Sequence, residues 1–138
     1  MKNISVIGLG KLGICFALTL EKQGYSVVGV DVSEDYIKKI NEKILVSPEP
    51  NVEYSLEKSK NLTATTEIKM AMDHSDVLFI FVATPSLPNG RYDHEQIESV
   101  VKQLVQYTSP SNLKHIIIGC TTMPGYCDSV HKRLQSNG

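Results

Sequence analysis

The sequence contains no tryptophan, only three cysteines and almost no net charge. A formal charge of -1 gives no electrostatic reason to expect a nucleic acid or an anionic membrane as a partner. The thiols of Cys15, Cys120 and Cys127 lack C-x-x-C spacing, which favours reduced cysteines of a cytoplasmic protein over a disulfide framework or a zinc site. No apolar run approaches the roughly 20 residues of a membrane span. Because the chain begins directly with a strand pattern, we expect no signal peptide.

What is present is the composition of an ordinary globular domain. The 138 residues are 41% hydrophobic and 21% charged. These values are typical of a folded protein with a core of its own. We therefore expect one domain over residues 1–138.

The N-terminal part of the chain contains a glycine-rich segment, Gly8-Leu9-Gly10-Lys11-Leu12-Gly13. An apolar, β-branched stretch precedes it and a helix-forming stretch follows it, and this strand–turn–helix context makes G-x-G-x-x-G informative. Gly8 would allow the tight turn, Gly10 would let a pyrophosphate approach the backbone, and Gly13 would let the helix pack closely. The free N–H groups at the start of the helix favour phosphate.

A second strand pattern ends at Asp31, about 20 residues after the glycine segment, where a dinucleotide fold places an acid. This carboxylate would accept hydrogen bonds from the adenosine ribose hydroxyls. It would repel a 2′-phosphate, so the pattern favours NAD over NADP. The alternative is that the glycines only form a tight turn and that Asp31 caps the end of the strand.

Strand patterns alternate with helix patterns, which predicts a parallel sheet covered on both faces. Strands are predicted at residues 4–7, 27–30, 62–65, 77–82 and 115–119. Helices are predicted at residues 11–23, 34–41, 52–59, 67–73, 93–107 and 127–134. Predicted N-caps are Ser33, Thr66 and Asp93, the last in a capping box with Gln96. Right-handed crossovers then give a Rossmann-like, doubly wound sheet of order 3-2-1-4-5.

Two loops follow the predicted fourth and fifth strands, at the edge of the sheet where ligands bind in such folds. In the first loop, Pro85 biases Thr84 toward an extended backbone, so that its hydroxyl could bond to a ribose or an amide. In the second loop, Thr121 and Thr122 could reach the nicotinamide end or hold a water. The alternatives are a plain Pro/Gly turn and a pair of turn threonines bonded to local backbone.

Together these pieces resemble the NAD-binding domain of the UDP-glucose/GDP-mannose dehydrogenase family. The resemblance covers nearly the whole chain, and its most specific parts are two loop motifs that a simple dinucleotide domain does not require. The family motifs are V-x-T-P with a later G-x-x-D, and S-T-x-x-P-G. This sequence has Val82-Ala83-Thr84-Pro85 with Gly90 and Asp93, and Cys120-Thr121-Thr122-Met123-Pro124-Gly125.

The resemblance implies an NAD-dependent enzyme that oxidises the C6 alcohol of a UDP- or GDP-sugar to the uronic acid, as in polysaccharide biosynthesis. The reaction uses two NAD and passes through a thiohemiacetal and a thioester on a cysteine. Thr121 matches the family threonine near the nicotinamide, an auxiliary catalytic residue that helps to place a water. The cofactor-binding residues implied by the match are Gly8, Gly10, Lys11, Leu12, Gly13, Asp31, Val32, Val82, Ala83, Thr84 and Thr121.

The sequence departs from the family pattern at three positions. Cys120 replaces the usual serine, Met123 replaces a frequent proline, and Tyr36 stands where many members have a basic residue near the adenosine. The family nucleophile lies in a G-x-C-x-P-K segment beyond residue 138, so no cysteine of this chain is assigned that role. The central and C-terminal substrate domains are likewise expected to be absent.

Two readings remain open at this stage. The chain is either the NAD-binding part of a nucleotide-sugar dehydrogenase, inactive alone, or a standalone nucleotide-binding module without catalysis. A dehydrogenase of the β-hydroxyacid type is a further alternative, which the two threonine loops argue against. Because the sixth strand of the usual order is expected to be missing, the sheet edge beside the fifth strand is predicted to invite self-association.

Overall fold

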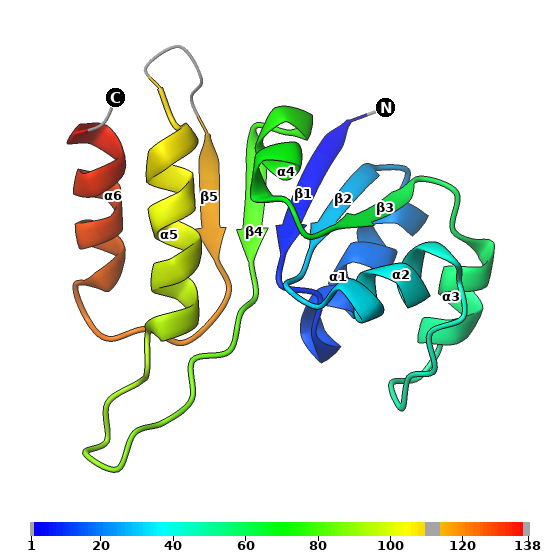
Figure 1. Cartoon of the computed structure of the whole chain (residues 1–138), viewed down its shortest axis with the longest axis horizontal. Helices are drawn as coiled ribbons and strands as arrows, with labels where there is room; N and C mark the ends of the chain where they lie inside the picture. The colour runs from blue at the N-terminus through cyan, green and yellow to red at the C-terminus, as the bar shows by residue number, and fades with distance from the viewer. Residues whose placement is uncertain (1, 110–113, 137–138) are drawn as a thin grey trace.

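The computed structural model describes residues 2–109 and 114–136, in which five parallel strands alternate with six helices (Figure 1). The sheet order is β3-β2-β1-β4-β5, which confirms the predicted topology. The strands are β1 (Asn3–Ile7), β2 (Ser26–Val30), β3 (Leu62–Thr65), β4 (Val77–Ile80) and β5 (His115–Ile118). The helices are α1 (Lys11–Lys22), α2 (Glu34–Asn41), α3 (Val52–Lys58), α4 (Ile68–His74), α5 (Glu95–Tyr107) and α6 (Tyr126–Ser136).

Helices cover the sheet in two layers. Side chains of α1, α2 and α3 form one buried cluster with one face of the sheet, and those of α4, α5 and α6 form a second cluster with the other face. In Figure 1, α5 and α6 lie beside β5, while α1, α2 and α3 lie toward β2 and β3. The N-terminal ends of α5 and α6 and the loops after β4 and β5 all lie at the carboxyl ends of the strands.

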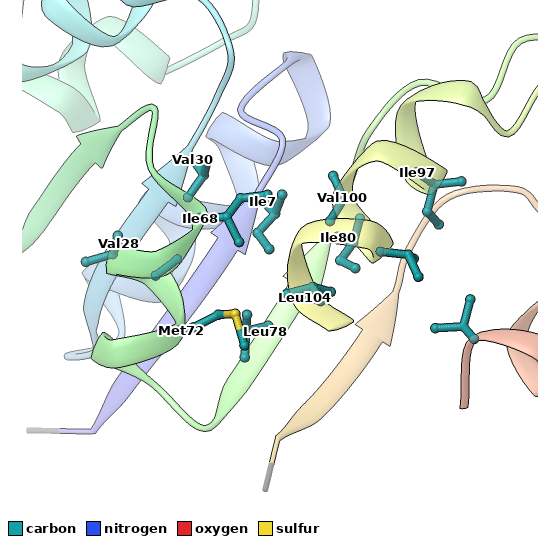
Figure 2. Close-up of a cluster of buried hydrophobic side chains, with 13 residues drawn as sticks. Ile7, Val28, Val30, Ile68, Met72, Leu78, Ile80, Ile97, Val100 and Leu104 are labelled. Carbon is teal, nitrogen blue, oxygen red and sulfur yellow. The ribbon is translucent and has the colours of Figure 1, made fainter. Parts of the chain in front are cut away.

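The cluster under α4 and α5 is the larger of the two and is drawn in Figure 2. Ile7 of β1 pairs with Ile80 of β4 in the parallel register, so their side chains stand on the same face of the sheet. Leu78, Ile97 and Leu104 complete the middle of the cluster with no solvent exposure. Burial of such a side chain contributes about 1.5–3 kcal/mol, so this face supplies much of the stability of the sheet.

The sheet is not covered evenly, and here one prediction was wrong. The apolar run at 77–82 predicts a strand buried on both faces, but only alternate residues of β4 are buried, and β5 has no fully buried residue. The face of β4 toward α1 is covered by ring contacts of Phe79 and Phe81 with Phe16. Ile117 of β5 is 38% exposed on that side, because the helices of this layer contact β1, β2 and β3 instead.

The predicted strand at 77–82 was also too long, since β4 ends at Ile80. The Phe81 N–H still donates to the Ile7 carbonyl at 2.7 Å, so one ladder bond continues before the chain leaves the sheet. The other predicted elements lie within one or two residues of the observed ones.

Of the three predicted N-caps, only Ser33 is confirmed: its hydroxyl accepts a hydrogen bond from the Tyr36 N–H. Thr66 is not a cap, because α4 begins one residue later, after Glu67. Asp93 is displaced from the cap position by His94, and its carboxylate accepts from the Glu95 N–H. The predicted capping box is absent, since the Gln96 side chain turns away to accept from the Ala83 N–H.

Candidate functional site

The glycine turn between β1 and α1 brings backbone atoms so close together that side chains could not fit between them. Gly8 has φ +94°, and a Cβ on it would lie 2.5 Å from the Phe81 carbonyl oxygen. A Cβ on Gly13 would overlap the Gly8 carbonyl oxygen, so this glycine lets the first turn of α1 pack on the bend. Gly10 differs, because no atom lies within 4 Å of where its Cβ would be. The backbone at Gly10 therefore faces open space.

The start of α1 is suited to an anion. Gly10 is its N-cap, so no side chain caps the helix, and its first turn contains no acidic residue. The first N–H groups of the helix therefore keep their hydrogen-bonding capacity and the positive end of the helix dipole is not neutralised. Lys11 and Leu12 are exposed in the same turn, and the Lys11 ammonium lies 4.0 Å from the Glu49 carboxylate.

Asp31 adjoins the glycine turn. One of its carboxylate oxygens accepts a hydrogen bond of 3.1 Å from the Leu9 N–H, and the other accepts from the Ser33 N–H at 3.2 Å. The two bonds fix the carboxylate between the bend and the beginning of α2. Hydrogen bonds to a charged acceptor of this kind are stronger than those between neutral groups.

Tyr36 is a contact that the sequence did not predict. Its hydroxyl donates to the Leu9 carbonyl at 2.6 Å, so a side chain of α2 holds the middle of the glycine turn. Burial, with the neighbouring Asp31 carboxylate, raises the pKa of Tyr36, which therefore remains a neutral donor. In the sequence Tyr36 is only a departure from the basic residue of the family pattern, and no spacing indicates that the phenol reaches back across 27 residues.

A cleft of about 520 Å³ opens at the carboxyl ends of β1, β2 and β4. Of the predicted cofactor residues, those that line it are Gly8, Gly10, Asp31, Val32, Val82 and Ala83. Gly13 is buried behind the turn, and Lys11 and Leu12 lie on the exposed first turn of α1. The cleft lies where the strand order reverses, the position at which ligands bind in open α/β sheets.

The wall of the cleft formed by α5 was missed at the sequence level. From α5 the cleft is lined by Gln96, Ser99, Val100 and Gln103, and from the start of α4 and the residues before it by Thr66 and Ile68. The three polar α5 residues share a helical face because they are spaced by three and four positions. They alternate with the buried Ile97, Val100 and Leu104, so a polar stripe beside the apolar one was the available signal.

Thr84 and Thr121 meet farther along the rim, outside the residues that line the cleft. Their hydroxyl oxygens are 2.8 Å apart, which joins the loop after β4 to the loop after β5. The structure thus brings together two predicted residues that are 37 positions apart in the chain.

A second hollow, of about 630 Å³, lies between β5 and α6 and is lined mainly by apolar side chains. Ile116, Ile118, Val130 and Leu134 belong to it, but none of the predicted site residues does. The cleft at the glycine turn is the better candidate, because backbone donors, a fixed carboxylate and a helix N-terminus converge there. Among the described residues no cluster of three or more His, Cys, Asp or Glu side chains could hold a metal ion, and no helix has the length and hydropathy to cross a membrane.

A parallel sheet in this order, with such a cleft at the reversal point, is the architecture of a Rossmann-type dinucleotide-binding domain. The sequence profile of the UDP-glucose/GDP-mannose dehydrogenase family, NAD binding domain, matches residues 2–138. The chain belongs to this family and constitutes an NAD-binding domain of it.

Individual relatives agree with this assignment. GDP-mannose 6-dehydrogenase of Pseudomonas aeruginosa is 36% identical over 132 residues, which are 93% of this chain and 30% of the relative. UDP-N-acetyl-D-mannosamine dehydrogenase of Methanocaldococcus jannaschii is 30% identical over 139 residues, which are 99% of this chain and 32% of the relative. This chain therefore spans about a third of the length of each of these two relatives.

Solved structures show the same likeness. A ternary complex of the Pseudomonas aeruginosa GDP-mannose dehydrogenase superposes with a TM-score of 0.88 at 34% identity, covering 97% of this chain and 32% of that one. A UDP-D-ManNAc dehydrogenase from Pyrococcus horikoshii gives a TM-score of 0.85 at 27% identity, covering 98% and 32%.

Proposed function

We propose that this chain is the cofactor domain of a nucleotide-sugar 6-dehydrogenase and that it binds NAD across the cleft at the glycine turn. The observation that carries the proposal is the position of Asp31, whose carboxylate is bonded to the backbone of the turn and lines the same cleft. A diphosphate on the turn would leave the adjoining ribose within reach of this carboxylate.

The diphosphate is assigned to the turn and the first turn of α1. Gly8 and Gly10 would present their backbone, and the N–H groups of Lys11, Leu12 and Gly13 would donate to phosphate oxygens. The open space beside Gly10 and the absence of acidic residues in the first turn of α1 support this assignment.

The adenosine end is assigned to Asp31 and Val32. Asp31 would accept from the ribose hydroxyls, and the Val32 side chain, which is 95% exposed at the edge of the cleft, would cover an apolar ring. A 2′-phosphate beside this carboxylate would be repelled, so the site should prefer NAD to NADP.

The other half of the cofactor is assigned to the β4 and β5 side. Val82 and Ala83 would run beside it, and Thr84 and Thr121 would stand at its nicotinamide end, where bound NAD supplies the hydride acceptor. The hydrogen bond between the two threonines supports a common role. Thr121 has a spare hydrogen-bonding site and would hold a water there.

We propose that the sugar nucleotide and the nucleophilic cysteine are supplied outside these residues, so that this chain binds NAD without turnover. Burial raises the pKa of the Cys15 thiol, with a smaller effect of Glu49, and burial also raises that of Cys120. Neither favours the thiolate that a nucleophile needs. The relatives are named for GDP-mannose and UDP-N-acetyl-D-mannosamine, which supports a nucleotide-sugar substrate without selecting one. The three free thiols also suit the cytoplasm.

Calorimetric titration with NAD, NADP and ADP-ribose tests the proposal. We expect binding of NAD and ADP-ribose and weaker binding of NADP. Absence of NAD binding at millimolar concentration, or tighter binding of NADP, would contradict it. Incubation with NAD and either UDP-glucose or GDP-mannose should produce no NADH; turnover would show that the chain carries its own nucleophile.

A further inference from the structure

His94 makes the contact that joins the start of α5 to the loop after β5. Its Nε2 accepts a hydrogen bond of 3.1 Å from the Met123 N–H, and its ring lies 4.2 Å from the ring of Tyr126, between centroids. Both partners belong to the segment that leads from β5 into α6. One imidazole thus touches the loop and the helix that follows it.

This loop carries Thr121, two residues before Met123. Besides His94, the loop is tied to the segment after β4 by the Thr84–Thr121 bond and by the Tyr92 N–H, which lies 3.4 Å from the Met123 sulfur. A sulfur acceptor is weak. The Met123 carbonyl accepts from the Tyr126 N–H at 3.1 Å, which is a bond within the same segment. The His94 bond is the contact that ties the Met123 backbone to the start of α5.

The bond requires one form of the imidazole. To accept at Nε2, the ring must be neutral with its proton on Nδ1. Protonation of Nε2 would turn the acceptor into a donor that faces another donor, and the Met123 N–H would lose its partner.

Titratable side chains of α5, α6 and the loop after β5 lie in the segments that meet at His94. The Arg133 guanidinium, 2.6 Å away, holds the pKa of the Glu98 carboxyl below its usual value, and the Tyr126 hydroxyl donates to the same carboxylate. Burial and the Glu98 bond raise the pKa of Tyr126, and burial raises that of Cys120 in the loop.

Asp93 and Glu95 flank His94 in sequence, and the Asp93 carboxylate is already bonded to the Glu95 N–H. Glu98 lies one helical turn after His94, where its N–H donates to the His94 carbonyl, and its carboxylate is paired with Arg133.

We propose that His94 is a positioning residue: its neutral ring holds the loop after β5, and with it Thr121, and its protonation releases that loop. The effect on NAD rests on the function proposed above, because only there does Thr121 lie at the nicotinamide end. The contact itself belongs to the free chain and can be tested without a ligand.

The first test is NMR of the ¹⁵N-labelled free chain, titrated from about pH 8 to about pH 5.5. We expect the His94 ring at high pH as the Nδ1–H tautomer, and amide signals of Thr121 and Met123 that shift with the midpoint of the His94 ring. An Nε2–H tautomer at high pH, or a Met123 amide that does not follow the ring, would overturn the proposal.

Two variants of His94 separate the effect of its hydrogen-bond acceptor from the effect of the bulk of its ring. His94→Gln keeps an acceptor that does not titrate, so the Met123 amide should become independent of pH. His94→Phe keeps a ring against Tyr126 without an acceptor, so Met123 should resemble the low-pH state at every pH. His131→Gln, at an exposed position on α6, is the matched control and should leave the Met123 titration unchanged. If a variant fails to fold, the NMR titration of the wild-type chain still tests the proposal.

The second test compares NAD with ADP-ribose, which lacks the nicotinamide. Loss of one neutral hydrogen bond should weaken NAD binding about fivefold at low pH and leave ADP-ribose unchanged. Equal pH dependence for both ligands would overturn the effect on the nicotinamide end. A chain that binds neither ligand contradicts the proposed function, and the NMR result then still decides the His94 proposal.

Discussion

The two halves of the cleft are built in different ways. On the β1–β2 side the strands are buried and the backbone forms the site: a Cβ at Gly8 would overlap the Phe81 carbonyl, and Asp31 is bonded to the turn. On the β4–β5 side the strands are only partly buried, and the loops are joined by side chains, through Thr84 with Thr121 and His94 with Met123.

The shape of the first half is thus set by close backbone packing, and that of the second half by a few side-chain hydrogen bonds. A backbone contact fails completely when a Cβ enters it, whereas a side-chain bond can be removed with a small loss. Substitutions at the close backbone contacts of the first half should therefore affect folding and binding together, and those in the second half should affect mainly the position of a loop.

The largest effect is expected at the glycine turn. Gly8→Ala should destabilise the chain by about 4 kcal/mol, because the residue would be strained at positive φ and would overlap the Phe81 carbonyl. Urea unfolding followed by circular dichroism measures the change. Gly10→Ala is the control: its Cβ meets open space, so stability should fall by no more than about 1 kcal/mol. NAD affinity should nevertheless drop, and equal destabilisation by both variants would contradict the account.

The next prediction compares the two faces of the sheet within the β4–β5 side. Leu78→Ala should cost about 3 kcal/mol, because this side chain is fully buried under α4 and α5. Ile117→Ala on the exposed face of β5 should cost less than about 1 kcal/mol. Thermal and urea unfolding of the two variants give the comparison. Similar losses would show that the β5 face is covered in solution.

A third prediction concerns binding in each half. Asp31→Asn should weaken NAD about 30-fold, since it removes a charged acceptor, and should reduce the discrimination against NADP. Thr84→Val on the other side should weaken NAD only about fivefold, by removing one neutral hydrogen bond. Isothermal titration of both variants against NAD and NADP measures this. If the Asp31→Asn chain keeps its NAD affinity within about twofold, Asp31 does not make the central contact with NAD.

The smallest effect is a pH dependence of stability at the α5–α6 contact. The Arg133 guanidinium holds the pKa of Glu98 below its ordinary value of 4.5. A lowered folded-state pKa stabilises the chain above the unfolded value, and this contribution is lost as the pH falls below 4.5. Both side chains are partly exposed, so the loss should stay under about 1 kcal/mol. The free energies of unfolding of wild type and Glu98→Gln, measured with urea, should converge at low pH. A difference that stays constant with pH would mean that the loss comes from packing.

The sequence predicted the backbone geometry of the glycine turn for a physical reason, while the binding role of these residues stays a prediction. Gly8, Gly13 and Asp31 act through local geometry that only their residue types allow, so a pattern within about 20 residues is enough to find them. Strand order followed similarly from alternation and right-handed crossovers.

What the sequence did not predict depends on contacts between distant residues. Tyr36 bonds to Leu9 and His94 bonds to Met123, and neither pairing leaves a spacing pattern. The Gln96 side chain accepts a hydrogen bond from the Ala83 N–H and forms no capping box. This, too, is a tertiary contact that the local sequence pattern does not predict. The exposed face of β5 was also not predicted. An apolar run indicates that a strand is buried, but it does not indicate which layer of helices covers each of its faces.

The most direct test of the account is a crystal structure of the chain grown with NAD. We expect the diphosphate against Gly10 and the N-terminus of α1, with the adenosine ribose hydroxyls bonded to the Asp31 carboxylate. NAD bound in the hollow between β5 and α6, or a ribose that does not touch Asp31, would contradict the central claim.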